Sequence, residues 1–488
     1  MVAGGTAGNP AANEPAELPG ESMATPPAVP WRALSAESDL GVLIKLAVPS
    51  ILATISGTVM SFVDFAFVSQ LGSAAQAAVG NAAVLVWAFF GLSLGIVSTV
   101  STFASQALGR ERPREGAGYM WQAVWLSLAM GAISAAILPL VPPVYAALGH
   151  PQEVLELEVV FTRILLLGAG PLTAAAAISN YFNGIHKPAV TMVSMIAANV
   201  FNALAGYVLV FGHWGFPKMG VAGAATATLA ALVVRLAWLL AALSMPRVRG
   251  EFGSFASWRY DWQRMKALLT IGAPAGLQWL ADVGTWAIFT NWLISKFGTV
   301  DIAATQIVWK LLELSWMPAI GIGVGINAVV GKAIGQGDIA LAQRRTRAGM
   351  LLCVGYMGFM GLVFAAGRHV LPELFTDEAD VLSLTPALML LGMTFQIFDA
   401  MSISYGSALR GAGDTRWPAI VSAAYAYGIV IFGGWIITLA WPGIGSIGPW
   451  ITNTVYAIFV SLTLRYRWQS GRWRELRIFA ERDEHRRG

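Results

Sequence analysis

Charged residues are scarce in this sequence. Only 12% of its 488 residues are Asp, Glu, Lys or Arg, about half the share usual in soluble domains, whereas 56% are hydrophobic. The single cysteine, Cys353, excludes an intramolecular disulfide framework and a cysteine-rich metal site. P-loop lysine, H-E-x-x-H and nucleophile-elbow motifs are also missing, so the sequence offers no motif for ATP hydrolysis or for the common hydrolase mechanisms. We therefore expect a polytopic membrane protein that is not an enzyme.

Apolar runs are what the chain has in abundance. Runs of roughly 18 or more residues, the length that crosses a bilayer, recur about twelve times. Their centres lie near Met60, Ser93, Met130, Gly168, Phe201, Leu229, Trp286, Pro318, Gly358, Leu391, Ile429 and Ala457. Residues 1–35 are instead rich in Ala, Gly, Pro and Glu, which predicts a disordered N-terminal tail. The fold class predicted is all-α, with twelve transmembrane helices.

Lys and Arg gather in alternate connections between these runs. The basic connections are residues 109–115, 246–266, 331–347 and 410–416, and the tail after Leu464 is basic too, whereas the intervening connections are neutral or acidic. By the positive-inside rule both termini lie in the cytoplasm and the chain is a multi-pass protein of the cell (inner) membrane. The basic residues behind the net charge of +4 then serve to orient the protein in the membrane, and nucleic acid is not an expected partner.

The sequence repeats itself at one spacing. "SQLG" (69–72) returns as "SKFG" (295–298), and "QALGR" (106–110) returns as "KAIGQ" (332–336), both 226 residues later. We therefore predict two pseudo-symmetric six-helix lobes around a central cleft: an N-lobe over 36–246, a cytoplasmic inter-lobe loop over 247–262, a C-lobe over 263–466 and a basic cytoplasmic tail over 467–488. Six is an even number, so the lobes have the same topology in the membrane.

Polar residues inside the apolar runs are the candidate site. An ionised Asp at the centre of a membrane helix costs roughly 2.5 to 3.5 kcal/mol, so Asp64 in "MSFVDFAFVSQLG" is expected to have a function. Thr54, Thr58, Ser61 and Asp64 share one helical stripe. Further candidates are Asn199 and Asn202, Gln278 and Asp282, Gln396 and Asp399, and the stripe Gln306, Lys310 and Glu313. A carboxylate there can carry a proton or bind Na⁺. Buried amides also serve simply to join helices, and Lys310 and Glu313 can neutralise each other.

Several stretches in order resemble one family. They are "LAVPSILATISGTVMSFVDFAFVSQLG", "SQALGR", "NVFNALAGYVLVFGHWGFPKMGVAGAATAT", "GAPAGLQWLADV", "AATQI", "GKAIGQGD" and "FQIFDAMSISYGSALRGAGDTRWP". Over about residues 40–466 the chain resembles the multidrug and toxic compound extrusion (MATE) family, most closely its NorM-like branch. That resemblance implies an antiporter that exports hydrophobic or cationic drugs in exchange for H⁺ or Na⁺ by alternating access. Its partners would be small amphipathic or cationic substrates and the lipid bilayer, and we expect a monomer without a bound cofactor.

The resemblance also implies roles for single residues. Asp64, Asn202 and Thr228 match the ion-coupling residues of the family's N-lobe, but Gly206 stands where many members have an Asp, which favours protons over sodium there. In the C-lobe, Asp282 and Asp399, with Gln278 nearby, match the cation site and are the residues expected to bind Na⁺. Asn199, Gln306, Lys310, Glu313 and Gln396 are further candidates for the cleft.

Three alternatives remain at this point, and one of them, a membrane enzyme, comes from another functional class and would be tested by assaying the purified protein for hydrolase activity. A flippase for a lipid-linked or amphipathic substrate in the same superfamily predicts several Arg or Lys inside the cavity, and the sequence indicates only Lys310, Arg163 and Arg235 within or near the spans. A major facilitator transporter also has two six-helix halves, but its G-x-x-x-D-R signature is missing from "GRERPREG".

Overall fold

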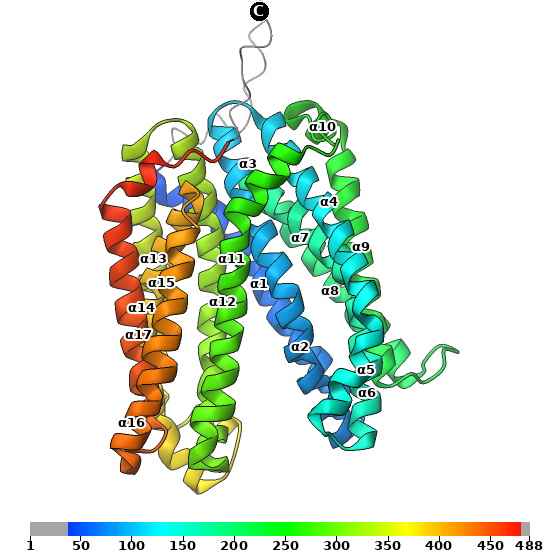
Figure 1. The fold of residues 1–488 in the computed structure, drawn as a ribbon, viewed down its shortest axis with the longest axis vertical. Helices are drawn as coiled ribbons and strands as arrows, with labels where there is room; N and C mark the ends of the chain where they lie inside the picture. The colour runs from blue at the N-terminus through cyan, green and yellow to red at the C-terminus, as the bar shows by residue number, and fades with distance from the viewer. Residues whose placement is uncertain (1–37, 480–488) are drawn as a thin grey trace, which may run out of the picture. The chain divides into compact units, whose positions relative to one another are not determined.

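The computed structural model describes residues 38–479, which are almost entirely helical and include no strand (Figure 1). In the first half the helices are α1 (Asp39–Ser69), α2 (Ser73–Ser98), α3 (Val100–Gly109), α4 (Pro113–Ile137), α5 (Val141–Leu148), α6 (Gln152–Leu166), α7 (Ala169–Gly184), α8 (Pro188–Phe211), α9 (Val221–Ser244) and α10 (Pro246–Phe252). In the second half they are α11 (Trp262–Ile288), α12 (Thr299–Gly335), α13 (Ile339–Ala366), α14 (Ala379–Ala412), α15 (Arg416–Tyr425), α16 (Gly434–Ala440) and α17 (Ile447–Gln469). The predicted disordered tail, 1–35, lies outside the described residues.

The helix ends follow from local chemistry. The Asp261 carboxylate accepts hydrogen bonds from the backbone N–H groups of Gln263 and Arg264 at 3.0 and 3.2 Å, and thereby caps α11. Asp338 caps α13 in the same way through Leu341 N at 2.8 Å. Proline occupies the first turn of α4 and of α8, where its missing N–H leaves no hydrogen bond unmade. Polar turns between apolar runs therefore set the helix boundaries.

The helices make this a multi-pass membrane protein. Within residues 38–479, ten helical segments are long and apolar enough to span a membrane, and the pair α6 and α7, bent by 46°, makes an eleventh. The remaining predicted span corresponds to α11. This helix has 27 residues and is long enough to span a membrane, but it is less apolar than the other spanning segments. Its sequence includes Arg264, Lys266, Gln278 and Asp282, so the polar candidates themselves lower its hydropathy.

Backbone geometry repeats at the spacing seen in the sequence, to within one residue. Residues with positive φ occur in matched pairs in the two halves: Gly72 and Gly298 (102° and 108°), Glu111 and Gly337 (58° and 78°), His186 and Gly413 (62° and 88°), and Gly220 and Gly445 (54° and 64°). Each half also buries its own apolar core, one between Val68 and Ala225 and one between Phe289 and Trp450. The lobe boundaries themselves stay a prediction.

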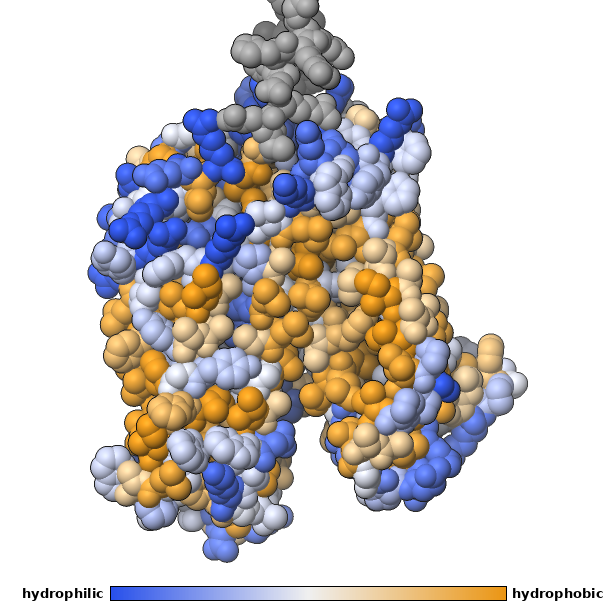
Figure 2. Space-filling view, viewed as in Figure 1, coloured by the Kyte–Doolittle hydropathy of each residue, from blue (hydrophilic) through white to orange (hydrophobic). Residues whose placement is uncertain are grey.

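The two halves meet at the end that bears the basic connections and separate at the opposite end. At the basic end α3 packs on α12 and α4 on α11, whereas α5 and α6 lie away from α16 (Figure 1). Figure 2 shows the resulting hollow, which opens at the end opposite the basic connections. A route between the halves is thus open at one end of the molecule and closed at the other.

Small residues close the seam, by which we mean the contact between the halves at the basic end. A side chain at Gly109 would overlap the carbonyl oxygen of Lys332, and one at Gly335 would overlap that of Gln106. These are corresponding positions of the two copies of the repeat, so the contact is reciprocal. Only glycine lets α3 and α12 approach this closely.

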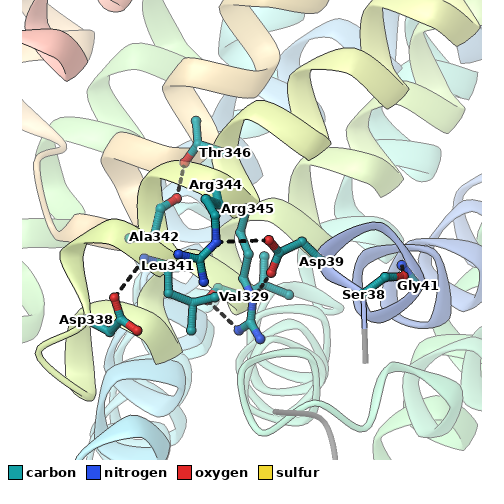
Figure 3. A network of polar contacts seen from close by, with 10 residues as sticks. All are labelled: Ser38, Asp39, Gly41, Val329, Asp338, Leu341, Ala342, Arg344, Arg345 and Thr346. Atoms are coloured by element: carbon teal, nitrogen blue, oxygen red, sulfur yellow. Dashed lines mark hydrogen bonds and ion pairs between the residues drawn. The ribbon is translucent and has the colours of Figure 1, made fainter. Parts of the chain in front are cut away.

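Polar contacts also cross the seam. Thr102 Oγ1 donates to the carbonyl of Arg410 at 2.9 Å, and Gln106 Nε2 donates to that of Gly411 at 2.9 Å. At the same end, Asp39 at the start of α1 forms ion pairs with Arg344 Nε and Arg345 Nε of α13, at 3.3 and 3.6 Å (Figure 3). The seam therefore joins helices from both halves by hydrogen bonds and by charge.

Candidate functional site

One carboxylate lies inside the first half. Asp64 projects from α1 and is half-buried, and Asn202 of α8 is 4% exposed. The Asn202 amide nitrogen donates to both carboxylate oxygens of Asp64, at 3.2 and 3.3 Å. The amide oxygen of Asn202 is buried and has no hydrogen-bond partner. Rotation of this amide by half a turn would present that oxygen to a protonated Asp64, so the pair can serve both protonation states.

The hydroxyls on the Asp64 stripe do not gather around the carboxylate. Thr54, Thr58 and Ser61 each donate to a carbonyl of their own helix, at 2.8, 3.3 and 3.2 Å. Thr228 does the same, donating to Ala224 at 3.1 Å. A hydroxyl in a membrane helix is readily satisfied by the preceding turn, and spacing along the sequence does not reveal this choice. Asn199 ties α8 to α1 through Ser56 Oγ at 2.8 Å.

Position 206 has a neighbour that the sequence does not reveal. Gly206 is buried, and a Cβ added there would lie 3.2 Å from two ring atoms of Phe67. Phe67 is on α1, one turn beyond Asp64. An aromatic ring therefore crowds the position at which a further oxygen ligand would have to stand.

Two carboxylates lie inside the second half. Asp282 of α11 is exposed, and Asp399 of α14 is half-buried with one carboxylate oxygen that has no partner. The two carboxylates interact electrostatically with each other, and both interact with Tyr456 of α17. Gln278 lies one helical turn before Asp282. This arrangement offers several oxygens to a cation or to protons, but it includes a counter-charge as well.

Arg410 is that counter-charge. It interacts electrostatically with Asp282, and its Nη2 donates to Ser407 Oγ at 2.9 Å. The sequence places Arg410 in a basic connection, whereas in the structure it belongs to the last turn of α14. The signal was available, because Arg410 follows Asp399 by eleven residues, or three helical turns, and so lies on the same face. Lys332 and Arg345 are further cations within helices, each 4% exposed at the seam, so the number of cations in the spans is larger than expected from the sequence.

Gln396 is the other unusual polar residue of this half. It is 1% exposed, and neither its amide nitrogen nor its amide oxygen has a partner. Next to it in the chain, Phe395 packs on Trp309, whose ring lies edge-to-face with that of Trp286 at 4.4 Å between centroids. Unpaired buried amides are rare because each costs free energy.

Two of the remaining candidates form an ion pair within one helix. Lys310 Nζ pairs with Glu313 Oε2 of the same helix at 3.0 Å, and it also lies 5.7 Å from the ring centroid of Phe62. The Lys310 side chain is 53% exposed, and Gln306 is exposed as well. Of the two roles the sequence left open for Lys310 and Glu313, mutual neutralisation is the arrangement found. The ion-coupling roles of all these residues stay predictions.

Known proteins resemble this chain in sequence and in fold. Residues 49–208 and 283–436 match the MatE family model. A probable multidrug resistance protein NorM from Bradyrhizobium diazoefficiens is 29% identical over 447 residues, which cover 87% of this chain and 92% of the relative. Another protein of that name, from Xanthomonas axonopodis pv. citri, is 28% identical over 409 residues, with 84% and 88% covered.

Solved structures show the same fold. One, described as the outward-facing conformation of a multidrug resistance MATE family transporter of the MOP superfamily, has a TM-score of 0.82 at 19% identity and covers 90% of this chain and 98% of its own. A MOP superfamily transporter from Pyrococcus furiosus has a TM-score of 0.81 at 18% identity, with 89% and 97% covered. The likeness extends over nearly the whole length of each chain.

Proposed function

Because the chain belongs to the MatE (MATE) family, we propose that it is a secondary active antiporter that exports hydrophobic or cationic drugs in exchange for H⁺ or Na⁺. The NorM relatives support multidrug transport by their names. The observation that carries the proposal is the placement of the carboxylates. Asp64 and Asp399 lie inside helices that are long and apolar enough to span a membrane, where an ionised group is costly unless it is used. Asp282 of α11 interacts electrostatically with Asp399.

The way in which the halves meet supports alternating access. The hollow is open at one end only, and the seam closes the other, so we take this conformation as one of two that the transporter adopts (Figure 2). Binding of H⁺ or Na⁺ at the carboxylates favours one conformation, and drug binding favours the other. A ligand shifts such an equilibrium only by its difference in affinity for the two states.

The orientation that we propose places the basic connections and both termini in the cytoplasm of an inner-membrane protein. The hollow then opens to the outside. A green fluorescent protein fused after residue 488 should fluoresce in cells, because it folds in the cytoplasm; a dark but intact fusion would reverse the orientation.

Efflux from reconstituted vesicles tests the proposal. A fluorescent lipophilic cation is loaded, and a proton gradient or a sodium gradient is imposed separately on wild type, Asp64→Asn and Asp282→Asn. Asp377→Asn is the matched control, since Asp377 is an exposed carboxylate in the α13–α14 connection.

Each outcome selects one reading. If the proton gradient alone drives efflux and Asp64→Asn stops it, protons couple through the N-lobe. If sodium alone drives efflux and Asp282→Asn stops it, the C-lobe is the coupling site. Absence of cation movement under either gradient would refute the antiporter and leave the flippase as the alternative.

A further inference from the structure

The chain crosses the seam once more after its last spanning helix. Beyond α17 the red segment in Figure 1 runs along the basic end of the molecule towards α3. It begins from a firm anchor in the second half: Trp473 is 1% exposed and stacks on Trp468 of α17 at 4.3 Å between ring centroids. The indole nitrogen of Trp473 also donates to the Trp468 carbonyl at 2.8 Å.

Adjacent residues of this segment pack on different halves. Ile478 is 5% exposed and fills the space beside Gly413 at the end of α14, so that a side chain at position 413 would overlap it. Phe479 packs edge-on against Phe103 of α3 and Tyr119 of α4, at 6.0 and 5.8 Å between ring centroids. The guanidinium carbon of Arg110 lies 4.4 Å above the Phe479 ring. Ile478 therefore belongs to the second half and Phe479 to the first.

We propose that residues 476–479 form a strap that holds the seam closed, and that Phe479 must leave the first half before the basic end can open. The requirement to open rests on the alternating access proposed above; the holding of the seam does not. Phe479 is half-buried, whereas Ile478 and Trp473 are buried. The strap thus releases at Phe479 and stays attached to the second half.

Thiol labelling measures whether the strap holds the seam. In a Cys353→Ala background, Ser101→Cys places a single thiol at the seam, where Ser101 is 3% exposed and its hydroxyl donates to Asn327 Oδ1 at 3.4 Å. We expect N-ethylmaleimide to label this thiol about tenfold faster when Phe479→Ala is added, since lost aromatic and cation–π contacts of about 1.4 kcal/mol shift an equilibrium by that factor. Leu476→Ala is the control, because Leu476 is 41% exposed.

The labelling result is read without any transport assay. Unchanged labelling in a Phe479→Ala protein that remains monodisperse, with an unaltered unfolding temperature, would overturn the strap. If Leu476→Ala accelerated the labelling as much as Phe479→Ala, the strap would be overturned too. Faster labelling would then not depend on the contact between Phe479 and the first half.

A tether tests whether the strap must detach. Arg110→Cys and Phe479→Cys, joined by a cleavable bismaleimide, should lower efflux at least about tenfold, and cleavage should restore it, since an opening that is blocked covalently stops the cycle. The same linker between Arg472→Cys and Leu476→Cys, both in the second half, should leave efflux unchanged. Full efflux with the strap tethered would refute the detachment step. If the untethered protein moves no cation at all, the proposed function fails while the labelling result stands.

Discussion

The two halves share a backbone plan but surround their carboxylates differently. In the first half, Asp64 has one partner, the amide of Asn202, and the nearby hydroxyls bond to their own helices. In the second half, Asp282 and Asp399 act on each other, and Arg410 supplies a counter-charge. A lone carboxylate facing an amide suits a proton, whereas paired carboxylates with spare oxygens suit a cation. Repetition of a fold has therefore not repeated its chemistry.

The sharpest test of this difference is cation binding. The double change Asp282→Asn and Asp399→Asn should weaken sodium binding at least about a hundredfold, because it removes both charges from the site. Asp64→Asn should leave sodium affinity within about twofold, since Phe67 blocks further ligands at that site. Isothermal titration of purified protein with NaCl measures both. Equal losses in the two variants would erase the distinction between the halves.

The next effect concerns the partner of Asp64. Asn202→Leu should destabilise the protein by about 2 kcal/mol, because it leaves a carboxylate without its donor. Asn199→Leu, which loses only a bond to the Ser56 hydroxyl, should cost about 1 kcal/mol. Unfolding in detergent measures both changes. When Asp64→Asn is already present, the stability lost through Asn202→Leu should be smaller, because no carboxylate is left without its donor. The stability lost through Asn199→Leu should be unchanged. If instead only the loss for Asn199→Leu became smaller, Asn202 would act only in packing.

A third difference lies at the matched turns before α8 and α15, where the first half has His186 and the second has Gly413. Burial, together with the nearby Lys332 charge, lowers the pKa of His186 to about 3 from 6.5. The His186 ring is therefore neutral, and its Nε2–H donates to the Ala328 carbonyl across the seam at 3.1 Å.

The sign of the resulting pH dependence follows from that pKa. A histidine with a lowered folded pKa binds more protons when unfolded, so stability is complete above pH 6.5 and falls by about 1.4 kcal/mol for each pH unit below it, until pH 3. His186→Asn should flatten this slope between pH 7 and 5, since asparagine tolerates the positive φ of this position and keeps an N–H donor. Unfolding measured across this pH range, with His213→Asn as the control for loss of a histidine, checks it. An unchanged slope would mean that other groups set the acid sensitivity.

The smallest effect is expected at the Lys310 and Glu313 pair. Both side chains are substantially exposed, so Lys310→Ala should cost about 0.5 kcal/mol or less. Sodium affinity should not change, because Lys310 pairs with Glu313 and not with a carboxylate of the acidic pair. A loss of sodium binding in the Lys310→Ala variant would mean that Lys310 belongs to the site of Asp282 and Asp399.

Much of the fold is readable from the sequence because hydropathy and turn chemistry are local. The spacing between copies of "SQLG" and "SKFG" already marks the turns at Gly72 and Gly298 that share a positive φ. The exception is informative: α11 falls short of a spanning helix by composition because Gln278 and Asp282 interrupt its apolar run.

Less of the candidate site is readable, because it depends on side-chain direction and on distant neighbours. Asp64 and Asn202 are 138 residues apart and were paired through the family resemblance, not by spacing. A helical stripe gives the face of Thr54 and Thr58 but not the carbonyls to which they donate. Phe67 beside Gly206 required the packed structure, and Arg410 was hidden among charges typical of an orientation signal.

The contact between Gly109 and Gly335 has a consequence for the origin of the chain. Position 109 of one copy approaches position 332 of the other, and position 335 approaches position 106, as in the self-complementary interface of a two-fold dimer. A single six-helix ancestor could therefore have assembled with its own twin, parallel in the membrane, before fusion. Residues 36–246 and 247–488 expressed as separate polypeptides should accordingly reassociate in one membrane.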